Sequence, residues 1–203
     1  MICLIKRDVK QDDRSYMFMH MFRIDRPDDF PYTPMDCKSG GVGVREVIKE
    51  AIGLLEKGQG FALATVVEQN RSAPRSAGAR MVVTLDGAVI GTVGGGALEA
   101  KVQKIAEEVV KNRKAAVIFF NLTAGDSSGM GMICGGDVRV LVDYVDSGDP
   151  VCLALYRELA AALERGDRAW LVTLLPSEEA GRPGRTFLVR DDGAIAGIPG
   201  DVA

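Results

Sequence analysis

A glycine triplet, Gly94–Gly96, follows an apolar stretch and leads directly into a helical pattern that runs from about Ala97 to Arg113. The first amide groups of a helix have no partner within the helix, and the positive end of the helix dipole lies there. Because glycine leaves these amides uncovered, the junction favours binding of an anion such as phosphate. The same glycines could instead form only a tight turn, since glycine adopts positive φ at little cost.

The composition narrows the possible partners and setting. The chain has 203 residues and a net charge of −3, which argues against nucleic acid or an anionic membrane as the main partner. No apolar run approaches the roughly 20 residues that span a bilayer. The four cysteines match no disulfide or zinc spacing, so we expect a cytoplasmic protein with reduced thiols. The single histidine, His20, lies outside the patterned part, so histidine-based nucleophilic catalysis is not expected.

Three segments differ in their patterning. Residues 1–42 lack steady periodicity and read as a poorly patterned N-terminal extension. Residues 43–146 combine two amphipathic helix patterns, a hairpin around Asp86-Gly87 and apolar runs at 115–120 and 138–142. Helices beside such strands predict an α/β fold, with a layered mixed sheet flanked by helices.

Residues 147–203 resemble a partial copy of the preceding segment, with a helix followed by strands. Gly193 lies 106 residues after Gly87, and Gly197 lies 106 residues after Gly91. A shared offset predicts a partial internal repeat packed on the first copy, although chance alignment of hairpin glycines would look the same. An incomplete repeat leaves an edge strand that needs cover, from which we expect a homodimer.

Several side chains near the triplet are candidates for ligand binding. Arg75 and Arg80 carry planar guanidinium groups suited to phosphate or carboxylate, although each could be an ordinary surface arginine. Glu99 could accept two hydrogen bonds from an amino-pyrimidinone ring, or could only favour the helix start. Cys134 lies beside Gly135 and Gly136, where backbone amides could lower the pKa of its thiol; the alternative is a small buried residue. Cys152 lies on the apolar side of its helix pattern and reads as core.

Five motifs in order resemble the XdhC/CoxI family, the accessory proteins of xanthine dehydrogenase and related molybdenum hydroxylases. They are Ser72-Ala73-Pro74-Arg75, Gly78-Ala79-Arg80-Met81, Asp86-Gly87, Gly91 to Gly96 with Leu98-Glu99, and Gly131 to Gly136. The resemblance covers roughly residues 44–146. Two departures from the family pattern stand out: Ala97 stands where many relatives have a cysteine, and we expect this chain to lack the family's C-terminal dinucleotide-type domain.

The resemblance implies a cytoplasmic, non-catalytic chaperone that carries molybdenum cofactor. Such proteins protect the cofactor while a cysteine desulfurase adds sulfur, and deliver it to the apo form of a xanthine dehydrogenase-type molybdenum hydroxylase. Gly94, Gly95 and Gly96 would hold the molybdopterin phosphate, with Arg75 and Arg80 as charge partners and Glu99 on the pterin. Cys134 would contact the metal, beside Gly135 and Gly136. Two alternatives stay open: a thiol-dependent redox or sulfur-transfer enzyme that uses Cys134, and a scaffold that recruits the dehydrogenase.

Overall fold

The computed structural model describes residues 3–6, 18–24, 44–71, 78–121, 136–175 and 185–197. Within these ranges the chain forms three helices and two five-stranded sheets. The helices are α1 (Val44–Glu56), α2 (Gly96–Asn112) and α3 (Pro150–Arg165). The strands are β1 (Cys3–Lys6), β2 (Phe18–Ile24), β3 (Phe61–Arg71), β4 (Arg80–Thr84), β5 (Val89–Gly91), β6 (Ala116–Asn121), β7 (Gly136–Val145), β8 (Ala169–Leu174), β9 (Arg185–Arg190) and β10 (Ile195–Ala196).

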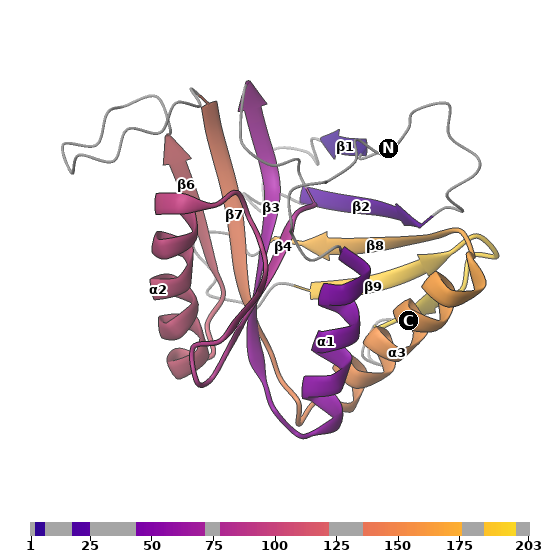
Figure 1. Ribbon diagram of the computed structural model, residues 1–203. Helices are drawn as coiled ribbons and strands as arrows, with labels where there is room; N and C mark the ends of the chain where they lie inside the picture. The colour runs from indigo at the N-terminus through magenta and orange to yellow at the C-terminus, as the bar shows by residue number, and fades with distance from the viewer. Residues whose placement is uncertain are drawn as a thin grey trace, which may run out of the picture.

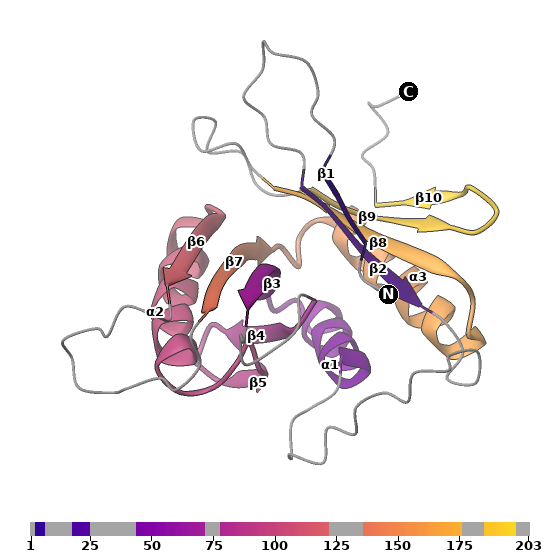
Figure 2. The ribbon, with the colours of Figure 1, turned by 90° about the horizontal axis from the view of Figure 1, so that it is seen from above.

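Sheet 1 has the strand order β5-β4-β3-β7-β6 and is covered by helices on both faces. Figures 1 and 2 show α2 on one side of this sheet and α1 on the other. Alternation along β4 explains this arrangement, because Met81 and Val83 pack towards α2 while Val82 packs towards α1. We call the side facing α1 and α3 the inner face of sheet 1.

The layered α/β class predicted from the sequence is confirmed. All strand pairs recorded among the described residues are antiparallel, whereas the sequence predicted a mixed sheet. The apolar runs at 115–120 and 138–142 indicated burial on both faces, which is typical of parallel strands. Here helices on both sides of an antiparallel sheet bury most of the run at 138–142, whereas Phe119 in the run at 115–120 is exposed.

Sheet 2 has the strand order β1-β2-β8-β9-β10, and α3 packs against it. Helix α1 lies between the two halves of the molecule because it is apolar on two sides. Val47, Ala51 and Leu55 pack on sheet 1, whereas Ile48 packs with α3 and sheet 2. Helix α3 begins at Asp149, whose carboxylate accepts a hydrogen bond from the Val151 amide at 2.8 Å.

The two sheets resemble each other in one hairpin hydrogen bond and in the order of their strands. The Thr84 amide donates to the Ala88 carbonyl, and 106 residues later the Arg190 amide donates to the Ala194 carbonyl. The strand orders also correspond, since β2 and β1 lie beside β8 as β7 and β6 lie beside β3. The internal duplication itself stays a prediction, which this shared geometry supports.

Strands β1 and β2 fall within residues 1–42, to which the sequence analysis assigned no regular structure. Both are short, and β2 pairs with β8 across a sequence separation of about 145 residues, from Ile24 to Ala169. A partner so distant leaves no local turn signal, so the pairing of β2 with β8 could not be found from the surrounding sequence.

Candidate functional site

Several chain segments meet at one end of sheet 1. Strand β3 ends at Arg71 opposite Gly136, where β7 begins, and β6 ends at Asn121 opposite Asp137. Strand β5 ends beside the start of β4 and leads into α2. We call this the loop end of sheet 1, and the ends of β3, β6 and β7 lie together near the top of Figure 1. The motifs at 78–81 and 91–96 therefore lie at this end of the sheet, while Asp86-Gly87 forms the hairpin at the other end. The motif at 72–75 and residues 131–135 of the last motif lie outside the described residues.

The glycine triplet forms the turn into α2, as expected. Gly94, Gly95 and Gly96 have φ values of 149°, 86° and 58°, and Gly95 is the N-cap residue. An added Cβ would meet no atom within 4 Å at Gly95 or Gly96, so the turn is open on its outer side. Glycine at these positions thus gives both the positive φ and the free approach that an anion would need.

Glu99 closes part of this turn from within the protein. Its carboxylate accepts hydrogen bonds from the Gly95 amide, at 2.9 Å, and from the Thr92 hydroxyl. The Gly94 amide in turn donates to the Thr92 oxygen at 3.2 Å. Glu99 therefore acts in the manner of a capping box, reaching back from the first turn to the N-cap amide. In this conformation an anion on the Gly95 amide would have to displace the Glu99 carboxylate.

Arg80 lies next to the segment that leads into the glycine triplet, since its carbonyl accepts a hydrogen bond from the Thr92 amide at 3.0 Å, but its side chain is buried. Arg80 is 4 % exposed and shares the inner face of sheet 1 with Val82, whereas α2 covers the opposite face. Burial lowers the pKa of its guanidinium, and the neighbouring Tyr156 acts against this decrease. This geometry favours a structural role for Arg80 between sheet 1 and the helices α1 and α3.

Three further polar groups lie near Tyr156 between sheet 1 and α3. Burial raises the pKa of Asp143 to about 7, against which the Tyr144 amide hydrogen bond acts. Burial, together with Asp149, raises the pKa of the Cys152 thiol to about 12, and its sulfur lies 3.5 Å from an Asp149 oxygen. Cys152 is thus a protonated, half-buried residue packed against the core, as the sequence predicted, and is a poor nucleophile.

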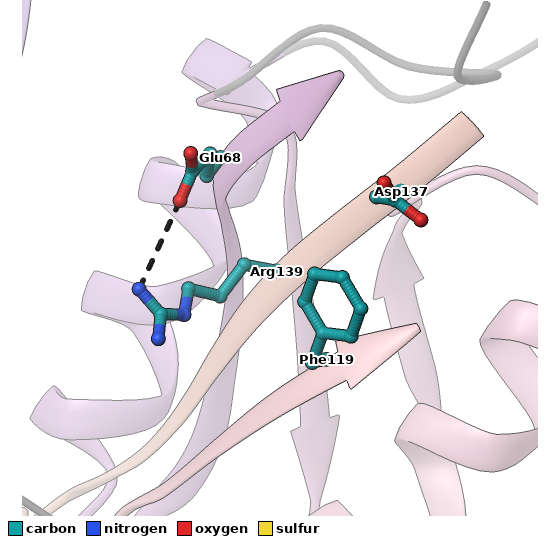
Figure 3. A pocket seen from close by; sticks show the side chains of 4 residues that line it. All are labelled: Glu68, Phe119, Asp137 and Arg139. Carbon is teal, nitrogen blue, oxygen red and sulfur yellow. Dashed lines mark ion pairs between the residues drawn. The ribbon is translucent and has the colours of Figure 1, made fainter. Parts of the chain in front are cut away.

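A pocket of about 180 Å³ lies on the inner face of sheet 1, close to the loop end (Figure 3). Its lining residues are Glu68 on β3, Phe119 on β6, and Asp137 and Arg139 on β7. A Glu68 oxygen lies 3.8 Å from an Arg139 nitrogen, and Figure 3 shows these side chains facing each other. Sequence reasoning missed this pocket, although the alternation of Asp137 and Arg139 with buried Val138 and Val140 marks one polar face of the strand.

The remaining predicted site residues lie outside the described residues. These are Arg75, Cys134 and Gly135; of the neighbouring Gly136 the structure describes only the backbone, at the start of β7. In the described parts of the chain, no group of three or more His, Cys, Asp or Glu side chains is arranged to hold a metal ion. The described helices include none with the length and apolar character needed to cross a membrane.

Comparison with known proteins shows what this chain is similar to. Residues 54–121 match the XdhC and CoxI family, which confirms the resemblance seen in the motifs. The chain is 31% identical over 116 residues to the molybdenum cofactor insertion chaperone PaoD of Escherichia coli (strain K12), an alignment that covers 56% of this chain and 35% of PaoD. It is 32% identical over 96 residues to the uncharacterized protein YqeB of the same organism, covering 47% of this chain and 18% of YqeB.

The fold is also found in a solved structure. A Bacillus halodurans protein, described as a xanthine dehydrogenase, superimposes with a TM-score of 0.59 at 24% identity, over 71% of this chain and 43% of that one. The likeness therefore concerns the fold. The present chain spans about a third or less of the length of PaoD and YqeB.

Proposed function

We propose, from the match of residues 54–121 to the XdhC and CoxI family, that this chain is the cofactor-binding part of a molybdenum cofactor insertion chaperone. It would bind the cofactor and hand it on without catalysing a reaction. The similarity to PaoD, a molybdenum cofactor insertion chaperone, supports this assignment. The observation that carries the proposal is the position of the Gly94–Gly96 turn beside the motif at 78–81, at the loop end of sheet 1.

The described residues at this end fit a phosphate-bearing ligand. The turn at Gly95 and Gly96 is open to an approaching group, and it lies at the positive end of the α2 dipole. We propose that the Gly94–Gly96 turn holds the cofactor phosphate, with Arg75 as its charge partner, and that Glu99 gives way as the phosphate binds. The cofactor, when bound, supplies a dithiolene-held molybdenum, for which a thiolate such as Cys134, beside Gly135 and Gly136, is a suitable soft ligand.

The proposed partners follow from this role. An apo molybdenum hydroxylase of the xanthine dehydrogenase type would receive the cofactor, and a cysteine desulfurase would supply its sulfur. The proposed setting is the cytoplasm, where a thiol such as Cys134 stays reduced. Strands β5 and β6 form the two edges of sheet 1, and pairing along either edge would support a homodimer.

The test is the metal content of the protein purified from a host that makes the cofactor. We expect molybdenum and phosphorus to co-purify with the wild-type chain in near-equal amounts. A Gly96→Asp substitution would place a carboxylate where the phosphate is proposed to bind, and we expect it to remove most of both elements.

Gly87→Asp is the matched control, because Gly87 and Gly96 both have positive φ and both leave open space for a Cβ. Gly87 lies in the hairpin at the opposite end of sheet 1, so this variant should retain the cofactor. Wild-type protein free of molybdenum, or equal losses in the two variants, would contradict the proposal.

A further inference from the structure

We infer that the pocket beside Phe119 binds a flat bicyclic ring that presents an amino-pyrimidinone edge, the chemistry shared by pterins and guanine. The inference rests on the proposed function, because it assigns the ring end of a pterin-bearing ligand to a place in the chain. It is carried by three features of the pocket: an acceptor without a donor, an exposed aromatic ring and a small volume.

The acceptor is Asp137. Its Oδ1 atom is buried and has no hydrogen-bond partner among the described residues. A buried carboxylate oxygen without a donor is unfavourable, and Asp137 lines the pocket, so rotation of its side chain towards the pocket would let a ligand supply the missing donor. A carboxylate has two acceptor oxygens side by side, which match a ring N–H and an adjacent amino group. An amino-pyrimidinone presents that pair of donors.

The aromatic ring is that of Phe119, which is 62% exposed although it lies on β6 of sheet 1. Phe119 pairs directly with Arg139 across β6 and β7, and Asp137 is two residues further along the same face. Diagonal neighbours at this spacing are within reach of an aromatic side chain. A ring stacked on Phe119 could therefore present its edge to Asp137; Figure 3 shows both side chains among the four that line the pocket.

The volume and charge of the pocket limit what can enter. At about 180 Å³ the pocket is below the roughly 300 Å³ at which small-molecule sites usually begin, so it suits one ring system rather than a whole cofactor. Glu68 and Asp137 would repel a phosphate, while Arg139 is held towards Glu68. The phosphate of such a ligand must therefore lie outside the pocket, in keeping with a separate phosphate position at the loop end.

The experiment is a titration of the purified chain with free pterin, followed by quenching of pterin fluorescence. We expect saturable binding by the wild type. Phe119→Ala should weaken it by about fivefold or more through loss of stacking, and Asp137→Ala by about tenfold or more through loss of a charge-assisted pair of hydrogen bonds. Lumazine, in which a carbonyl replaces the amino group, should bind at least about tenfold more weakly than pterin, because one donor becomes an acceptor.

Two control variants share the exposure and chemistry of the tested residues. Leu85 is also 62% exposed but lies at the opposite end of sheet 1, and Glu108 is an exposed acid on α2. Leu85→Ala and Glu108→Ala should bind pterin as the wild type does. Guanosine is titrated in parallel: tighter binding of guanosine with the same variant losses would support the pocket and assign it to a nucleotide base, and tighter binding of pterin would assign it to a pterin.

The inference is overturned if pterin and guanosine both fail to bind, or if the four variants bind alike. Its failure is distinguishable from failure of the proposed function. Protein that co-purifies with molybdenum and phosphorus yet binds neither ring would leave the chaperone role standing without this pocket. Phe119 is exposed, so its substitution leaves the fold intact, and a circular dichroism spectrum of each variant verifies this.

Discussion

Asp143 is a carboxyl group held on the inner face of sheet 1, where burial raises its pKa to about 7 from an ordinary value of 3.8. The folded protein therefore binds this proton more tightly than the unfolded chain does. Protonated Asp143 therefore adds to the free energy of unfolding near pH 4. This contribution is lost as the pH rises to about 7. The change amounts to up to about 4 kcal/mol across that range.

We predict that Asp143→Asn makes the free energy of unfolding less dependent on pH. At pH 8 the variant should be more stable than the wild type, since the amide removes the cost of a buried charge, and the difference should shrink towards pH 5. Urea denaturation at both pH values measures this. The exposed Asp191→Asn is the control, and an equal pH slope in wild type and Asp143→Asn would contradict the prediction.

At the scale of elements, the hairpin β4–β5 depends on a glycine that sits against another strand. Gly91 has a φ of 88°, and an added Cβ would lie 2.4 Å from the Arg80 carbonyl oxygen and 2.7 Å from Val47. Gly87 in the same hairpin has a φ of 84° but open space around it. Substitution of Gly87 therefore tests backbone strain alone, whereas substitution of Gly91 tests the same strain together with a steric clash.

We expect Gly87→Ala to lower the free energy of unfolding by roughly 1–2 kcal/mol through backbone strain alone. Gly91→Ala should lower it by roughly 3 kcal/mol or more, because the clash with Arg80 and Val47 adds to the same strain. Urea denaturation of both variants tests the difference. Equal losses would mean that the contact around Gly91 relaxes at no cost.

Elements with local signals could be predicted from the sequence. The apolar periodicity of residues 44–55 and the Asp86-Gly87 turn both gave the element that the structure has. The antiparallel pairing of β6 and β7 could not be predicted in this way, because a buried strand has the same composition in either direction. Within the candidate site, the turn at Gly94–Gly96 was predictable from its glycines, whereas the burial of Arg80 depends on elements distant in sequence: α1 packs on the same face, and Tyr156 lies 76 residues further along the chain.

The pocket beside Phe119 shows a further reason for incomplete prediction. Phe119 lies in an apolar run whose sequence predicts complete burial. It is exposed because β6 is an edge strand of sheet 1 and α1 does not cover it. Only the register of β6 against β7 shows which residues of the run share a face with Asp137 and Arg139. Register is a property of strand pairing, and one residue of slip would reverse it.

At the scale of the whole molecule, α1 joins the two sheets through Val47 on one side and Ile48 on the other. Loss of either contact exposes apolar surface in both halves, so we predict a single cooperative unfolding transition. The only tryptophan, Trp170, lies on β8 and reports on sheet 2, while far-ultraviolet circular dichroism reports on all helices. The two signals should change at the same urea concentration in the wild type and in Ile48→Ala. Earlier loss of the Trp170 signal would show that sheet 2 unfolds by itself.

The pairing of β2 with β8 has a consequence for how the chain is made. Ile24 is translated 145 residues before its partner Ala169, and Phe22 is translated 149 residues before Leu171. On the ribosome, β2 must therefore wait for about 145 further residues to be synthesised before it can pair with β8. Contacts so distant in sequence are slow to form, and waiting strand edges are prone to aggregation. A newborn chain of this protein is thus expected to depend on shielding of its first strands.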